Sequence, residues 1–152
     1  MKKWLLLAWL LGLTSVTGAW AQAGRKINWG DSRKAIIGYE GIKPSFITTT
    51  EIIYDSVLVH NYKFKLSYTF KDNKLRSVCY YGMAPLGDSL KIKTTFLALL
   101  NEVTIDYGDP TVSTEDSDHI KKLTFTANQT RVSIFFGLIA QAYYSLNVQY
   151  AH

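Results

Sequence analysis

The residues that could do chemistry are few, and they are spread along the chain. Its three histidines, His60, His119 and His152, lack metal-site spacings such as His-x-x-x-His. The acidic loop 115–119, with Glu115, Asp116, Asp118 and His119, could hold a cation weakly, but it departs from the Asp-x-Asp-x-Asp-Gly order of a calcium loop. The sequence also has no glycine-rich phosphate loop and no Gly-x-Ser-x-Gly motif. We therefore expect no metal, no cofactor and no catalytic residues.

Carboxylates at turns supply the one enzymatic alternative. Asp72, Asp106 and Asp109 fall at predicted turns or at a helix end, where capping and solvation explain them. Two such acids could meet in space and act as a hydrolytic pair, as in glycosidases. A small exported hydrolase that uses loop carboxylates and His119 is therefore the alternative to a protein without enzymatic activity.

Cys79 is the only cysteine, and it lies in the strand-like run 76–81. Because it has no partner in the chain, an intrachain disulfide is excluded. We expect a buried free thiol, with an intermolecular disulfide or a reactive thiol as alternatives. A cysteine nucleophile would need a base nearby in space, which the sequence does not show.

Residues 1–21 are typical of a secretory signal peptide. Two lysines precede the apolar run 4–13, which is shorter than the roughly 20 residues that a membrane-spanning helix needs. The small-x-small pattern Ala-Trp-Ala then predicts cleavage before Gln22, with a second site before Gly24. We expect an exported protein, periplasmic or secreted, with no membrane segment after cleavage.

Composition fits one globular domain at 22–152. The whole chain has 152 residues, 47% of them hydrophobic, with 17 basic and 12 acidic side chains. These values exclude a disordered tail, a collagen-like fibre and a disulfide-rich miniprotein. Removing the leader takes away two lysines and lowers the formal charge from +5 to +3. So small an excess gives no support to nucleic-acid binding, and we expect no nucleic-acid partner.

Periodicity predicts two helices and six strands. A short helix at 33–40 begins after a cap at Asp31 or Ser32 and ends at Gly41. The other predicted elements are strands at 51–59, 62–70 and 75–81, a longer helix at about 90–106, and strands at 121–126, 131–136 and 142–150. We expect an α+β fold of two helix–three-strand units, with the helices packed on one face of an antiparallel sheet. The repeated order indicates either an internal duplication of 29–82 and 87–150 or a coincidence of common elements.

The run Trp29-Gly30-Asp31-Ser32, followed by a short helix, Gly41 and three strands, resembles small exported modules of the BamE/SmpA type. A tandem copy is similar to the β-lactamase-inhibitor protein. The segment 66–78 also resembles the YxFxxGKLxxV hairpin of such modules. The resemblance implies helices against one face of an antiparallel sheet and a function in binding other proteins. The chain lacks the lipidated cysteine of BamE-type proteins and the disulfides of the inhibitor fold.

The outer face of the sheet is the predicted functional surface. If Phe64 and Leu146 point to the helices, strand parity places a mixture of cations and rings on the opposite face. This set is Lys63, Lys65, Arg76, Tyr80, Arg131, Phe135 and Tyr143. Exposed rings beside cations are typical of binding surfaces; a cover of loops, or of a second subunit's sheet in a homodimer, is the alternative. We expect a non-enzymatic protein that binds another protein or an anionic envelope component through this face.

Overall fold

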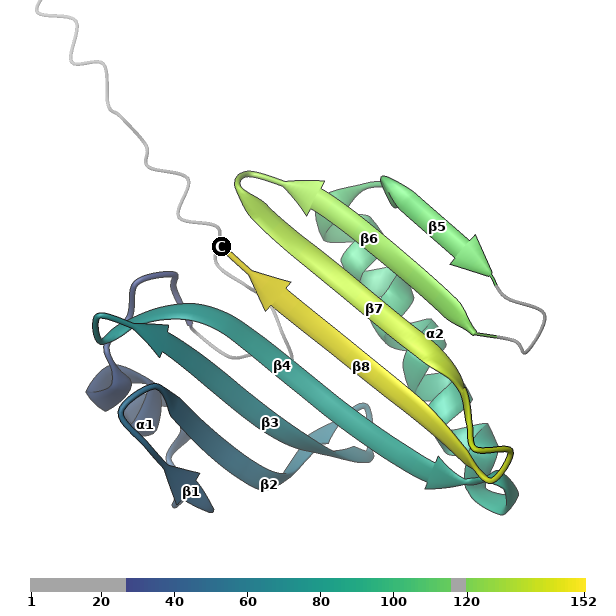
Figure 1. Ribbon diagram of the computed structural model, residues 1–152, viewed down its shortest axis with the longest axis horizontal. Helices are drawn as coiled ribbons and strands as arrows, with labels where there is room; N and C mark the ends of the chain where they lie inside the picture. Colours follow the sequence, from purple (N-terminus) through teal and green to yellow (C-terminus); the bar gives the residue numbers. More distant parts are fainter. Residues whose placement is uncertain (1–26, 116–119) are drawn as a thin grey trace, which may run out of the picture.

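The computed structural model describes residues 27–115 and 120–152, and within these ranges the strands form one eight-stranded antiparallel sheet (Figure 1). The strand order is β1-β2-β3-β4-β8-β7-β6-β5. The elements are α1 (Arg33–Glu40), β1 (Phe46–Ile47), β2 (Glu51–Val59), β3 (Tyr62–Lys71), β4 (Lys74–Pro85), the short 3₁₀ turn η1 (Leu86–Asp88), α2 (Ser89–Tyr107), β5 (Val112–Glu115), β6 (Lys121–Ala127), β7 (Thr130–Ile139) and β8 (Tyr143–Ala151). The predicted signal peptide and Asp116, Asp118 and His119 lie outside the described residues.

Short turns connect consecutive long strands, with two residues each between β2 and β3, β3 and β4, and β6 and β7, and three between β7 and β8. Both residues have positive φ in the pairs His60-Asn61, Asp72-Asn73, Asn128-Gln129 and Ala140-Gln141. Such turns match the right-handed twist of the flanking strands. The chain therefore runs up and down through β1–β4 and again through β5–β8, and the sheet becomes continuous where β4 pairs with β8.

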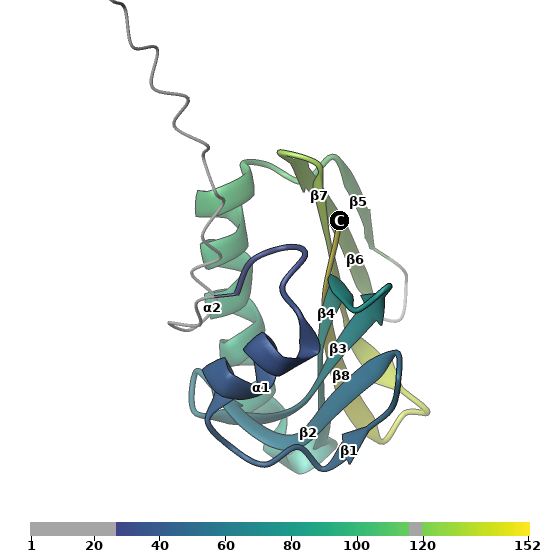
Figure 2. The same cartoon turned by 90° about the vertical axis from the view of Figure 1, so that its left-hand side faces the viewer.

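Both helices lie on one face of the sheet, here called the inner face (Figure 2). The short helix α1 begins where Ser32 accepts a hydrogen bond from the Ala35 N–H, and it ends at Gly41 with φ 63°. Its Ile36 is fully buried, and its Glu40 accepts a hydrogen bond from the Tyr68 hydroxyl of β3.

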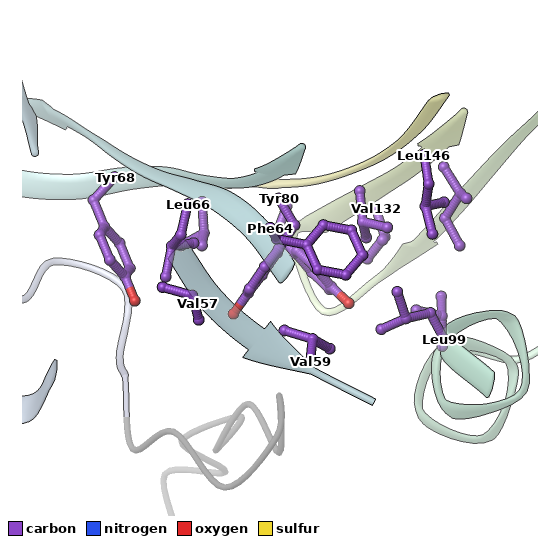
Figure 3. Close-up of a cluster of buried hydrophobic side chains, with 14 of the residues drawn as sticks. Val57, Val59, Phe64, Leu66, Tyr68, Tyr80, Leu99, Val132 and Leu146 are labelled. Atoms are coloured by element: carbon purple, nitrogen blue, oxygen red, sulfur yellow. The ribbon is translucent and has the colours of Figure 1, made fainter. Parts of the chain in front are cut away.

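The long helix α2 supplies most of the cover. Its buried side chains face β8, β4 and β6, and the Phe96 ring stacks on Phe136 with 4.5 Å between centroids. Figure 3 shows Leu99 of α2 facing the layer of side chains from the strands, which includes Phe64 and Leu146. No helix in the described part of the chain has the length and apolarity needed to cross a membrane.

The α+β class, the antiparallel sheet and the placement of the helices on one face are confirmed. The prediction of two helix–three-strand units is wrong, because the structure has one continuous sheet and two unequal helices of 8 and 19 residues. The sequence prediction missed the edge strands β1 and β5. They have two and four residues, each begins shortly after a proline, and both are too short to show a period-two pattern.

Candidate functional site

The face opposite the helices, here called the outer face, carries an open hollow of about 520 Å³. Its lining comes from β4, β8, β7 and β6, which lie side by side in that order. The residues that line it are Cys79, Tyr81, Lys122, Leu123, Thr124, Ser133, Ile134, Phe135, Asn147 and Gln149. Four strands therefore contribute to one surface, although their sequences are up to about 70 positions apart.

Pairing arranges the side chains of the outer face in rows across the strands. The central row is Lys65, Tyr81, Asn147, Phe135 and Lys122, one residue each from β3, β4, β8, β7 and β6. The floor row beside it is Cys79, Gln149, Ser133 and Thr124. The hollow forms because the floor row consists mainly of short side chains, whereas the central row contains two rings and has a lysine at each end.

Asn147 lies in the middle of the hollow, with Tyr81 on one side and Phe135 on the other. Its Oδ1 atom is shielded from solvent and accepts no hydrogen bond from the described residues. The hydroxyl of Ser145, the next outward residue on β8, is fully buried and is also without a partner there. A buried acceptor without a donor costs free energy, so rotation of this amide toward a ligand that donates a hydrogen bond is favoured.

Cations outnumber carboxylates on the outer face. Seven basic residues lie on it or at its bulge: Lys63, Lys65, Lys71, Lys74, Arg76, Lys122 and Arg131. The acidic side chains on this side among the described residues, Glu51 and Asp55, both belong to β2 near one edge. A negatively charged partner is therefore favoured over most of this face.

Cys79 is a half-buried free thiol on the floor of the hollow. Burial raises its pKa above the ordinary value, and the negative charge of Glu51 raises that pKa further. The thiol is therefore protonated at neutral pH, which makes it a poor nucleophile.

The structure brings most of the predicted binding residues to the outer face but gathers only one of them in the hollow. Lys63 and Lys65 lie on β3, whereas Arg76 and Arg131 lie toward the opposite end of the strands. Phe135 lines the hollow, and Tyr143 is 45% exposed at the far end of β8.

The prediction that Tyr80 lies on the outer face is wrong. Tyr80 is 4% exposed, and its ring meets Phe64 edge-on in the core. The cause is a β-bulge: Phe70 pairs with Leu75 while Thr69 pairs with Ser77, so that Arg76 is an extra residue in β4. One extra residue reverses the parity of the rest of the strand and places Tyr81 outward instead.

Sequence reasoning missed Tyr81, Lys122, Asn147 and Gln149. Lys122 precedes the alternating buried pair Leu123 and Phe125, so parity could have found it. Asn147 and Gln149 alternate with the predicted inward residues of β8, but they are neither aromatic nor charged, and the predicted surface consists of rings and cations only. Tyr81 could not be placed without knowledge of the bulge.

The other candidate residues have structural surroundings. His60 pairs with Glu102 of α2 at 3.0 Å, and His152 stacks on Trp29 at 5.6 Å between centroids. Within residues 27–115 and 120–152, no group of three or more His, Cys, Asp or Glu side chains could hold a metal ion. The hydrolase alternative stays a prediction, because His119 lies outside the described residues.

Comparison of the chain with protein-family models, with curated proteins and with solved structures finds no match. The resemblance to BamE/SmpA-type modules and to the β-lactamase-inhibitor protein therefore stays a prediction.

Proposed function

We propose that the protein is an exported, non-enzymatic binding protein whose outer face holds a negatively charged partner. The observation that supports this proposal is the composition of that face. It carries seven cations and several accessible rings, while the helices cover the opposite face.

Large apolar side chains also lie exposed on the outer face: Leu58 is 63% exposed, Tyr143 45% and Met83 42%. Exposed apolar side chains among cations have the composition of interfaces, where rings and arginine are enriched. The hollow is broad and open to solvent, which suits an extended surface contact better than an enclosed reaction centre.

Charge reversal tests the proposal. We expect wild-type protein to bind at least one of three anionic probes: polyglutamate, vesicles rich in anionic phospholipid, or an acidic polysaccharide. The triple substitution Lys63→Glu, Lys65→Glu and Arg131→Glu should weaken this binding at least about tenfold, since each exposed pair contributes up to about 1 kcal/mol. Affinity should also fall as salt is raised.

The matched control reverses three exposed lysines away from the outer face: Lys34 on α1, Lys43 in the following loop and Lys91 on α2. This variant has the same net charge as the first and should retain wild-type affinity. Equal loss in both variants, or no binding of any anionic probe by the wild type, would overturn the proposal.

A further inference from the structure

We infer that the partner held by the outer-face hollow is an acidic polysaccharide, which lies across β4, β8, β7 and β6. This inference rests on the proposed function and names the chemical class of its partner. Three features of the central row carry it: the amide at its centre, the two rings beside that amide, and the lysines at its ends.

The amide at the centre distinguishes a sugar from a simple anion. The Oδ1 of Asn147 accepts no hydrogen bond from the described residues and is shielded from solvent, so a ligand reaches it only when the amide rotates toward the hollow. Once turned outward it needs a donor, and ionised carboxylates and phosphates offer acceptors only. A sugar hydroxyl both donates and accepts. Gln149, Ser133 and Thr124 in the floor row add neutral groups with the same dual capacity. The floor of the hollow thus matches a ligand rich in hydroxyl groups.

The rings provide platforms at a suitable spacing. Tyr81 and Phe135 lie two strands apart, about 10 Å between their Cα atoms. The hydroxyl of Tyr81 donates to the sulfur of Met83, the next outward residue, which holds the ring along β4. The C–H face of a sugar packs on such rings, and this separation is close to the length of a disaccharide in an extended chain. Alternate sugars can therefore contact Tyr81 and Phe135.

Lysines at both ends of the row select negative charge. Beyond Tyr81 the row ends at Lys65 of β3, and beyond Phe135 it ends at Lys122 of β6. The whole row therefore spans about 19 Å across the strands. Carboxylates of a uronic-acid chain can reach both lysines, whereas a neutral chain uses neither. Rings and cations also suit single-stranded nucleic acid. Preferred binding of a single-stranded oligonucleotide is therefore one of the outcomes of the test below.

The test measures binding of a defined oligouronate, in low salt, by calorimetry. A neutral oligosaccharide of the same linkage and length, anionic phospholipid vesicles, polyglutamate and a single-stranded oligonucleotide serve as comparison probes. We expect the oligouronate to bind at least about tenfold more tightly than the neutral chain and to bind in preference to the other three. Bound oligouronate should also protect Cys79, the sole thiol, from alkylation.

Variants separate the hollow from the rest of the surface. Tyr81→Ala and Phe135→Ala should each weaken oligouronate binding about tenfold or more, while Tyr39→Ala, which removes an exposed ring on α1, should leave it unchanged. Asn147→Leu keeps the size of the side chain and removes the unpartnered acceptor. We expect it to weaken binding without loss of thermal stability, which separates ligand binding from a role in folding. It also keeps the test decisive if a ring variant fails to fold.

Each contrary outcome has a defined meaning. Equal affinity for the neutral and acidic chains, preferred binding of the oligonucleotide, or an unchanged affinity in Asn147→Leu and Tyr81→Ala would overturn the inference. If polyglutamate or vesicles bind through the basic side chains of the outer face and oligouronate does not bind, the inference is overturned and the proposed function stands. Failure of every anionic probe would overturn both.

Discussion

Cys79 lies between Ser67 of β3 and Gln149 of β8, on the floor of the hollow. Its half-buried position and its neighbour Glu51 both disfavour the thiolate. A reactive cysteine needs the opposite surroundings, with a cation or a base beside the sulfur. The thiol acts as a small apolar side chain that gives the hollow its depth, and its rate of alkylation reports on access to the hollow.

Alkylation kinetics test the state of Cys79. Because burial and Glu51 raise its pKa, iodoacetamide should react slowly at pH 7, and the rate should rise with a midpoint above that of the unfolded protein. Glu51→Gln should lower the midpoint toward that of the unfolded chain. Mass spectrometry over a pH series measures both. A midpoint below the unfolded value would contradict this assignment.

The bulge at Arg76 shows what can be predicted for an element from its sequence and what cannot. Alternation in residues 62–70 correctly predicts which face of β3 is buried. The same rule fails in β4, because an extra residue leaves both Leu75 and Val78 inward without any special residue type to mark it. Fold class thus follows from periodicity, whereas the hollow depends on strand register between β4 and β8, which is set by long-range packing.

Phe96 joins α2 to the sheet. Its ring is 4% exposed and stacks on Phe136, whereas its neighbour Leu97 is 61% exposed. Phe96→Ala should lower the free energy of unfolding by about 3–5 kcal/mol, because the large cavity cannot close. Leu97→Ala should change it by about 0.5 kcal/mol or less. Urea denaturation followed by circular dichroism measures both, and equal effects would refute this packing.

The whole molecule is a two-layer structure with one covered and one bare sheet face. Buried apolar residues from α1, α2 and all the long strands form one cluster. The site could not be predicted from the sequence, because Tyr81, Asn147 and Lys122 come from three strands whose order in the sheet is not the order in the chain. The pairing of β4 with β8 brings them together.

This shared core also predicts how stability depends on pH. Burial raises the pKa of Tyr150, and nearby groups, with Tyr80 and Tyr107 first among them, raise it further. Burial also raises the pKa of Tyr107, with a further contribution from Asp106, and the Tyr107 and Tyr150 rings lie 6.5 Å apart. Tyr62 and Cys79 shift in the same direction, both chiefly through burial.

In each case the folded protein keeps a proton that the unfolded chain releases at lower pH. The contribution to stability is therefore complete below the unfolded pKa values and is lost as pH rises through the folded ones. We expect the free energy of unfolding to fall steadily above about pH 9. Tyr150→Phe removes one ionising group and should make this fall shallower, while Tyr39→Phe, an exposed control on α1, should not. Denaturant titrations at several pH values measure how steeply the free energy of unfolding changes with pH. A constant or rising free energy of unfolding between pH 9 and 11 would show that these groups ionise as readily in the folded protein as in the unfolded chain.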